Sequence, residues 1–431
     1  MKNDFFAPSL ETIQPDKLKV LQLSKLRDSV AFAVRNSPYY RDKIGLSSKS
    51  ADLASLADFA HNIPLTTKDD LRSAGRYDFL AVPKHEIVEI HFSSGTSGSP
   101  SYSFLTKDDI ALGSEYLART WYMQGVREDS TFAMLASYGL FSAGLLNHYA
   151  IQHIGAFVIP LGGAIPLKSV ELIRNFEANI AAAVASYYPY LISIAAKQKI
   201  NLRDLGLRHL VAGGEPFTEQ ERTYINNSFN ASLLDQYGLC EINTGIAGEC
   251  GNKDGLHLLA DYVYPEIVSV DSGKALPDGE DGELVLTTFH KRAAPLLRYR
   301  TGDITSITWK PCVCGRTMPR IARIKKRTTD TLFYKGVGIE KDYVSSVLLE
   351  MKDVLNPYLW QIEVNRIDGS ESMLLHVDMY GNKSISLQRI TEKLINAKLG
   401  LKTKVVNFSD EELANLGSSK LKHFIDHRNI S

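Results

Sequence analysis

The sequence predicts an α/β protein with a large N-terminal part and a small α+β part at the C-terminus. Short apolar runs typical of buried parallel strands alternate with stretches of helical character. The runs are TFAMLASY, AFVIPLG, LRHLVAGG and GELVLTTF. Beyond a basic, threonine-rich segment, RIARIKKRTTDTL, the pattern changes to two strands and one helix. We therefore expect a boundary in this segment, with domains over residues 1–326 and 327–431.

Periodicity predicts the individual elements. In residues 15–37, leucine, valine and alanine recur at helical spacing, which indicates an amphipathic helix. Residues 169–186, SVELIRNFEANIAAAVAS, are expected to be helical as well. Towards the end of the chain, residues 358–367 and 372–380 predict a β-hairpin, and residues 384–400 predict a helix that follows it.

Composition narrows the classes of partner. Lysine plus arginine equals aspartate plus glutamate at 49 each, so the chain has no electrostatic footprint for nucleic acid or for an anionic membrane surface. The most apolar passage, residues 141–167, is interrupted by Asn147, His148 and other polar residues, which argues against a membrane span. The N-terminus lacks the apolar core of a secretory signal. We expect a soluble cytoplasmic protein with neither a nucleic-acid nor a membrane partner.

Residues 93–100, SSGTSGSP, form a glycine- and hydroxyl-rich loop between two strand-like runs. A Walker-type phosphate loop would need a lysine and a following helix, and this segment has neither. The sequence predicts a hairpin loop instead, because SYSFLT after it alternates as a strand. Its glycines would allow close approach of a phosphate, and its hydroxyls would donate to the phosphate oxygens. By itself the segment could equally be an exposed polar turn.

Four further motifs follow the loop in order: GGEPFTEQ, DQYGLCE, RYRTGD and GSSKLKHFIDHR. Together with SSGTSGSP, this set resembles the signature of adenylate-forming enzymes, specifically their phenylacetate-CoA ligase branch. The resemblance covers nearly the whole chain. It implies a large N-terminal adenylate-forming domain with packed β-sheets and helices, and a small mobile α+β domain at the C-terminus.

The resemblance also implies the chemistry. A small-molecule carboxylic acid, of aryl or arylacetic type, attacks the α-phosphate of ATP with the help of Mg²⁺, and coenzyme A or another thiol or amine acceptor then displaces AMP. Catalytic roles fall to Lys420, Glu241 and Thr96, with Glu241 as the Mg²⁺ ligand and Asp303 on the ribose hydroxyls. The nucleotide would be bound by Ser93, Ser94, Gly95, Thr96, Ser97, Gly98, Gly214, Glu215, Pro216, Asp235, Tyr237, Gly238, Glu241, Asp303 and Arg327.

Each of these residues also has an ordinary structural reading. Glu241 could cap a neighbouring helix, Asp303 could be a turn residue after a glycine, and Lys422 competes with Lys420 by sequence alone. For the acid, the resemblance indicates an apolar, aromatic-lined cavity. Its candidate residues, each of which could instead be core packing, are Tyr138, Phe141, Gly144, Tyr187 and Tyr188.

The cysteines suggest a metal site. Cys312 and Cys314 lie in PCVCGR, and Cys250 and His257 lie in ECGNKDGLH. Three thiols and one imidazole suit a tetrahedral Zn²⁺ that is closed to water and therefore structural. The alternative is a set of buried packing thiols. Cys240, the remaining cysteine, is expected to be a small packing residue.

Three departures from the family pattern bear on activity. Ser99 stands where the phosphate loop usually carries lysine. Lys326 and Thr329 replace the glycine and the pivot aspartate at the domain junction, and KGVGIEKDYV after it lacks the usual asparagine and proline. The change in the loop should weaken ATP binding or slow the reaction, and the two junction changes bear on the domain rotation that precedes thioester formation. Two alternatives therefore stay open: adenylation with a non-CoA acceptor, such as a carrier protein or an amine, and a catalytically impaired nucleotide-binding homologue. A homodimer is possible.

Overall fold

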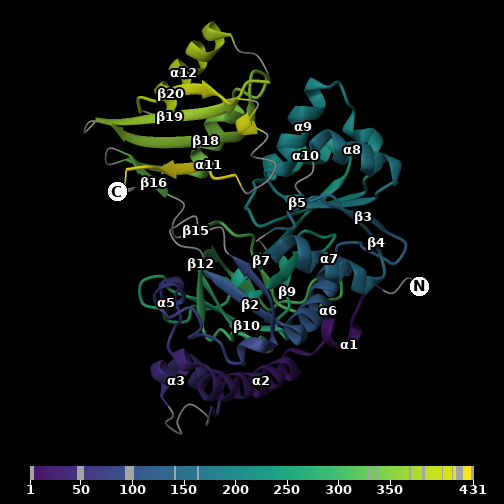
Figure 1. The fold of residues 1–431 in the computed structure, drawn as a ribbon, viewed down its shortest axis with the longest axis vertical. Helices are drawn as coiled ribbons and strands as arrows, with labels where there is room; N and C mark the ends of the chain where they lie inside the picture. The colour runs from purple at the N-terminus through teal and green to yellow at the C-terminus, as the bar shows by residue number, and fades with distance from the viewer. Residues whose placement is uncertain are drawn as a thin grey trace.

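The computed structural model describes residues 4–45, 53–92, 101–139, 142–162, 165–327, 331–334, 337–367, 370–380, 384–399, 401–409, 411–413 and 421–428. These residues form five sheets with helices packed around them, which confirms the predicted α/β class. Helices α2 and α3 lie at one end of the molecule, and the sheet that contains β18 and β19 lies at the other (Figure 1). In the part of the chain that is described, no helix is both long and apolar enough to cross a bilayer.

A nine-stranded sheet runs through the middle of the molecule in the order β13-β14-β9-β8-β7-β6-β5-β3-β4. Its β4, β3, β5, β6 and β7 pair in parallel, and β8, β9, β14 and β13 continue it antiparallel. The strand bounds are β3 Thr131–Met134, β4 Phe157–Pro160, β5 Ile180–Val184, β6 His209–Gly213, β7 Ser232–Leu239, β8 Thr244–Glu249, β9 Leu256–Leu258, β13 Ile307–Thr308 and β14 Arg320–Ile321.

Helices cover both faces of the parallel strands, which explains why these strands read as continuous apolar runs. In β5, Ala181 and Ala183 belong to the core under α8, α9 and α10, whereas Ile180 and Ala182 belong to the core under α6 and α7. Figure 1 shows the two helix groups on opposite sides of this sheet. The helices are α6 Lys107–Met123, α7 Ser142–Ile154, α8 Pro166–Asn175, α9 Tyr187–Lys197 and α10 Glu219–Phe229.

Two expectations about these elements were wrong. Residues 169–186 are not one helix: α8 ends at Asn175, Glu177 takes a left-handed backbone with φ of 50°, and the alanine-rich remainder is strand β5. Alanine favours a helix locally, but pairing with β3 and β6 and burial between the two helical layers decide. The run GELVLTTF is strand β11, and it pairs antiparallel with both of its neighbours. Burial on both faces gives the same apolar pattern in either orientation.

A four-stranded antiparallel sheet and a hairpin complete the N-terminal part. The predicted hairpin around residues 93–100 is confirmed, because β1 pairs antiparallel with β2 and Phe92 lies opposite Tyr102. The predicted helix over residues 15–37 is confirmed as α2. The strands are β1 Ile87–Phe92, β2 Tyr102–Thr106, β10 Val263–Val268, β11 Gly282–Thr288, β12 Tyr299–Thr305 and β15 Lys326–Arg327. The remaining helices, with the short 3₁₀ turns, are α1 Pro8–Glu11, α2 Pro15–Asn36, α3 Pro38–Ile44, α4 Leu56–Asn62, α5 Lys68–Ser73, η2 Lys84–Glu86, η3 Leu202–Leu205 and η4 Cys240–Ile242.

The C-terminal residues build a separate sheet with its own apolar core around Trp360. The predicted hairpin is β18–β19, and the predicted helix is α12. This part packs on α9 and α10, where Ser193 donates to the buried Asp378 and Tyr224 lies against Tyr358. The division at residue 326 stays a prediction. The elements are β16 Thr331–Tyr334, β17 Val337–Glu340, α11 Lys341–Leu349, β18 Asn356–Ile367, β19 Ser370–Asp378, α12 Ile385–Leu399, β20 Lys404–Asn407 and β21 Phe424–Asp426.

Candidate active site

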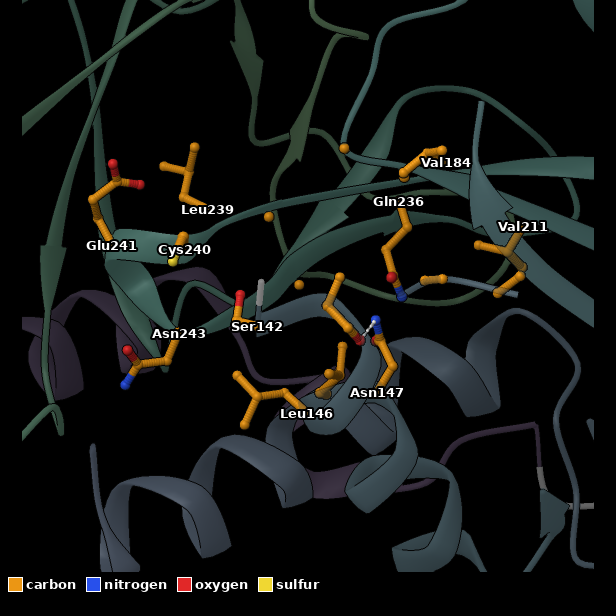
Figure 2. A pocket seen from close by; sticks show the side chains of 18 of the residues that line it. Ser142, Leu146, Asn147, Val184, Val211, Gln236, Leu239, Cys240, Glu241 and Asn243 are labelled. Atoms are coloured by element: carbon orange, nitrogen blue, oxygen red, sulfur yellow. Dashed lines mark hydrogen bonds between the residues drawn. The ribbon is translucent and has the colours of Figure 1, made fainter. Parts of the chain in front are cut away.

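A cavity of about 160 Å³ lies where β3, β5, β6 and β7 end, against α6 and α7. Carboxyl ends of parallel strands are the usual location of ligand sites in such sheets, because the loops there diverge. Figure 2 shows Glu241 and Asn243 on one side of this cavity and Val184 and Val211 on the other. The described residues that line it are Lys68, Phe92, Leu117, Trp121, Met134, Ala136, Ser142, Ala143, Leu146, Asn147, Ala182, Ala183, Val184, Val211, Gly213, Gly214, Gln236, Gly238, Leu239, Cys240, Glu241, Asn243, Gly245, Tyr299 and Thr301.

Small residues at the strand ends keep the cavity open. Ala182 and Ala183 line the cavity just before the end of β5 at Val184, and Gly213 ends β6, where an added Cβ would lie 3.2 Å from the Gln236 carbonyl oxygen. Gly214 has a φ of 79°, a conformation that glycine adopts without strain. The walls are otherwise mainly apolar, so the cavity suits an apolar ligand that carries few polar groups.

Glu241 stands at the polar end of the cavity. It lies on the short turn η4 that follows β7, the residue is 6% exposed, and its Oε1 accepts a hydrogen bond of 2.7 Å from Ser101 Oγ. The Lys68 ammonium is 3.9 Å from the same oxygen. A buried carboxylate with a cation beside it can hold a hard metal ion or face a phosphate.

Lys291 holds the turn of Glu241 by hydrogen bonds. Its ammonium is buried and donates to Ser103 Oγ at 3.0 Å and to the Glu241 backbone carbonyl at 2.5 Å. Burial lowers the pKa of Lys291 to about 8. Burial also raises the pKa of the neighbouring Cys240 thiol to about 12, so that thiol stays protonated at neutral pH and is a packing group rather than a nucleophile.

The motif residues Tyr237 and Asp303 meet across two sheets. Tyr237 on β7 donates a 2.7 Å hydrogen bond to Oδ2 of Asp303 on β12, and both side chains are buried. Asp303 lies opposite Arg327 in the pairing of β12 with β15. The two segments DQYGLCE and RYRTGD therefore converge at one place, as a shared site requires.

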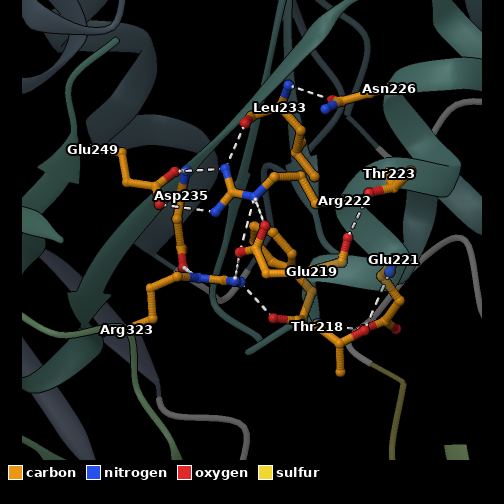
Figure 3. Close-up of polar contacts among 11 residues, drawn as sticks. Thr218, Glu219, Glu221, Arg222, Thr223, Asn226, Leu233, Asp235, Glu249 and Arg323 are labelled. Atoms are coloured by element: carbon orange, nitrogen blue, oxygen red, sulfur yellow. Dashed lines mark hydrogen bonds and ion pairs between the residues drawn. The ribbon is translucent and has the colours of Figure 1, made fainter. Parts of the chain in front are cut away.

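Asp235 is held by a dense ionic network, drawn in Figure 3. Its carboxylate pairs with Arg323 at 2.9 Å, and its backbone amide donates to Glu249 at 2.8 Å. Glu249 in turn accepts two hydrogen bonds of 2.8 Å from the guanidinium of Arg222. Burial raises the pKa of Asp235 to about 6. The network fixes the strand from which Tyr237 and the turn of Glu241 project.

The GGEP motif adjoins the same region. Gly214 lines the cavity, and Oε2 of Glu215 accepts a hydrogen bond of 2.9 Å from the Ser186 amide. The Pro216 carbonyl accepts one of 3.3 Å from Lys341, which belongs to the C-terminal part of the chain. The motif thus lies between the cavity and the C-terminal residues.

Several candidates for the acid site lie elsewhere. Tyr187 and Tyr188 are fully buried in the core under α8 to α10, where the Tyr188 hydroxyl donates to the Ala181 and Val211 carbonyls. Tyr138 lies outside the cavity lining and hydrogen-bonds His148 at 3.0 Å. At Gly144, an added Cβ would lie 2.2 Å from the Ser137 carbonyl oxygen, so this glycine serves close packing at the start of α7. The structure brings none of these four into the cavity wall, and their contact with the acid stays a prediction.

Some candidates fall outside the described residues. They are the loop residues Ser93, Ser94, Gly95, Thr96, Ser97, Gly98 and Ser99, together with Phe141, Thr329 and Lys420. The backbone of Arg327 is described but its side chain is not. The expected roles of these residues stay predictions.

The predicted metal ligands do come together. The ligand atoms of Cys250, His257, Cys312 and Cys314 all lie within 4.8 Å of one another. The Sγ atoms of Cys250 and Cys312 are 3.9 Å apart, and Cys314 Sγ is 3.4 Å from His257 Nε2. A tetrahedral Zn²⁺, with bonds of about 2.3 Å to sulfur and about 2.0 Å to nitrogen, separates two sulfurs by about 3.8 Å and a sulfur from a nitrogen by about 3.5 Å. The four residues therefore fit a zinc ion.

Sequence reasoning missed several lining residues. Trp121 on α6 and Asn147 on α7 join by a 2.9 Å hydrogen bond from the indole N–H at the cavity wall. Lys68 lines the cavity and Lys291 donates to the Glu241 carbonyl, and neither residue belongs to a signature motif. In the sequence, Lys291 lies in the mixed segment FHKRAAPLL, whose composition gives no signal for burial.

Comparisons with known proteins place this chain among enzymes that bind AMP and ligate acids to coenzyme A. The family model for AMP-binding enzymes matches residues 31–289. The phenylacetate-coenzyme A ligase of Thermus thermophilus is 36% identical, with 84% of this chain and 81% of that protein covered. The Pseudomonas putida enzyme of the same name is 35% identical, with 92% and 91% covered. Among solved structures, a 2-hydroxyisobutyryl-CoA ligase in complex with 2-HIB-AMP superposes with a TM-score of 0.83 at 22% identity, over 100% of this chain and 94% of that one.

Proposed function

We propose, because this chain belongs to the phenylacetate-coenzyme A ligase family, that the carboxylic acid it activates is an aryl or arylacetic acid. Membership of this family makes the protein an AMP-forming acid–coenzyme A ligase, which uses ATP to activate the acid and then transfers the acyl group to coenzyme A. The single observation that carries the choice of acid is the apolar cavity that ends at Glu241.

The reaction needs positioning and charge neutralisation more than proton transfer. A carboxylate oxygen of the acid attacks the α-phosphorus of ATP, the bond from that phosphorus to the bridging oxygen breaks, and pyrophosphate leaves with the electron pair. The sulfur of coenzyme A then attacks the acyl carbon, the thiol proton passes to solvent, the carbon–oxygen bond to phosphate breaks, and AMP leaves with the electron pair. Both steps build negative charge on phosphate, so cations beside the phosphates lower the barrier.

The size of the cavity supports an aromatic acid. It measures about 160 Å³, and an apolar protein cavity of about 150 Å³ is known to accept benzene. Trp121 and Leu146 supply apolar surface, and Asn147 and Ser142 are polar groups at the same wall. One aromatic ring with a short side chain would fill this space and direct its carboxylate towards Glu241.

The nucleotide would occupy the polar end. Asp303, held by Tyr237, accepts the ribose hydroxyls, and Gly214 and its neighbours border the adenine. Glu241 fits Mg²⁺ because it offers carboxylate oxygen, the ligand that this ion prefers; the ion, when bound, neutralises phosphate charge. Arg327 and Lys420 would complete the site from a mobile C-terminal domain that begins at residue 327.

Zn²⁺ in the cluster of Cys250, His257, Cys312 and Cys314 would have a structural role. All four ligand positions belong to the protein, so no position is open for substrate. The cluster joins β9 to the loop between β13 and β14. Arg316, next to it, binds Glu11 at 2.7 Å and so ties the N-terminal segment to the same place. A cytoplasmic location and a homodimer remain expectations.

The test of the proposed function is acid-dependent ATP–pyrophosphate exchange over a panel of aryl, arylacetic, aliphatic and amino acids, without and then with coenzyme A. Exchange with an arylacetic acid and AMP release stimulated by coenzyme A are the expected results. Exchange that coenzyme A does not stimulate would favour another acceptor, and no exchange with any acid would favour an impaired homologue.

A variant at the cavity mouth tests the acid class. Ala143 lines the cavity yet is exposed, so Ala143→Leu adds bulk there without overpacking the core. We expect the KM for an arylacetic acid to rise about tenfold, as a loss of about 1.4 kcal/mol implies, with the KM for ATP unchanged. Ala111→Leu, at an exposed alanine of α6 outside this cavity, is the matched control. Equal KM values in the two variants would place the acid elsewhere.

A further inference from the structure

A second cavity, of about 270 Å³, lies on the other side of Glu241. It is lined by residues of α5 and the turn after it, by β2, and by residues 291–296. Glu241 is the residue that both cavities share. The two cavities therefore adjoin at Glu241.

The charged side chains that line this second cavity are mostly cationic. They are Arg72, Arg76 and Lys291, against the single carboxylate of Glu241. Helix α5 organises the cations: Lys68 and Arg72 are four residues apart and so lie on one face, with Lys68 on the first cavity and Arg72 on the second. Arg72 also pairs with Asp69 at 3.4 Å, and that carboxylate is 90% exposed.

We infer that this second cavity binds the pyrophosphate end of ATP, with Arg72 and Arg76 as its phosphate contacts. The inference rests on the proposed function, and it supplies what the phosphate loop lacks at Ser99. The α-phosphate would lie beside Glu241, where the first cavity ends, and the β- and γ-phosphates would extend towards the arginines. Guanidinium groups bind phosphate oxygens in pairs of hydrogen bonds, so two of them replace the cation of one loop lysine.

The phosphates of coenzyme A share this chemistry, so the experiment must separate the two sources. We would titrate the full-length protein with magnesium pyrophosphate, with AMP and with coenzyme A by isothermal calorimetry, and repeat this for Arg72→Gln and Arg76→Gln. Arg35→Gln, at an exposed arginine of α2 that lines neither cavity, is the matched control.

We expect each variant to bind pyrophosphate about tenfold more weakly than the control, the loss typical of one charge-assisted phosphate contact, with AMP and coenzyme A within twofold of the wild type. Arg76 is exposed, so its substitution should leave the fold intact; Arg72→Lys, which keeps the charge, should recover part of the loss. Three results would each overturn the inference. The arginine variants could bind pyrophosphate as tightly as the control, they could lose affinity for coenzyme A instead, or the wild type could bind no pyrophosphate.

The binding assay separates this inference from the proposed function. If no acid supports exchange but the arginine variants lose pyrophosphate affinity, the acid activation fails and the pyrophosphate site stands. If an arylacetic acid supports exchange and the KM for pyrophosphate is the same in both variants and the control, the ligase function stands and the pyrophosphate site is wrong.

Discussion

Replacing Arg222 by methionine should strongly destabilise the protein. The Arg222 guanidinium makes two hydrogen bonds of 2.8 Å to Glu249 and one of 2.7 Å to the Leu233 carbonyl (Figure 3). Arg222→Met keeps most of the side-chain volume and removes these three bonds, together with the 3.2 Å hydrogen bond from Arg222 Nε to Glu219. Glu249 is 0% exposed, and the remaining donor to its carboxylate among the described contacts is the Asp235 amide.

The magnitude follows from burial. A buried carboxylate that loses its guanidinium partner is left with an uncompensated charge, and breaking such a pair costs about 3–5 kcal/mol of the free energy of unfolding. Removing both charged groups leaves no unpaired ion, and a well-packed apolar pair is often nearly neutral. We therefore expect Arg222→Met with Glu249→Leu to be more stable than Arg222→Met alone by at least about 2 kcal/mol.

These free energies form a double-mutant cycle. Equilibrium urea denaturation of the wild type, both single variants and the double variant measures it. The matched control is Arg203→Met, because Arg203 bonds only exposed groups and a surface change is expected to cost less than about 0.5 kcal/mol. A loss below about 1 kcal/mol in Arg222→Met, or a double variant no more stable than the single one, would refute the claim that this pair carries a buried charge.

Tyr237→Phe removes the hydroxyl that holds Asp303 and should raise the KM for ATP about tenfold in the exchange assay, with the KM for the acid unchanged; an unaltered KM for ATP would exclude a positioning role. The wild type should contain one zinc per chain by elemental analysis, and Cys312→Ser should lose both the metal and several degrees of melting temperature, whereas Cys240→Ser should keep the metal; zinc-free wild type contradicts this. The stability should also depend on pH through Asp235, because its pKa in the folded protein, about 6, lies above its ordinary value. The folded state therefore binds the proton more tightly than the unfolded state. The stabilisation from this group is present below about pH 4 and is lost as the pH rises through 6. The free energy of unfolding from urea titrations should therefore change in favour of Asp235→Asn relative to the wild type between pH 4 and pH 7, by up to about 3 kcal/mol. A difference between the two proteins that stays constant with pH would refute the raised pKa.

The regular elements could be predicted where burial alone sets the pattern. The apolar runs of β3, β4 and β6 and the helical spacing of α2 are properties of each segment's own residues. They can therefore be recognised without knowing which other elements pack against them. Orientation is not local: β11 carries the same apolar pattern as the parallel strands yet pairs antiparallel, because the pattern records two covered faces and not the direction of the neighbouring strand.

By itself, the sequence determined the family-level chemistry and the apolar strands, and it singled out the three cysteines and one histidine that come together, because motifs and spacing along the chain are enough to recognise these. Only the tertiary structure decided what surrounds them. It placed Tyr187 and Tyr188 in the core and brought Trp121 and Lys68 to the cavity, over separations that no periodicity spans. A cavity is the space left between packed elements, so its lining depends on how helices and sheets meet and not on the pattern within any one of them.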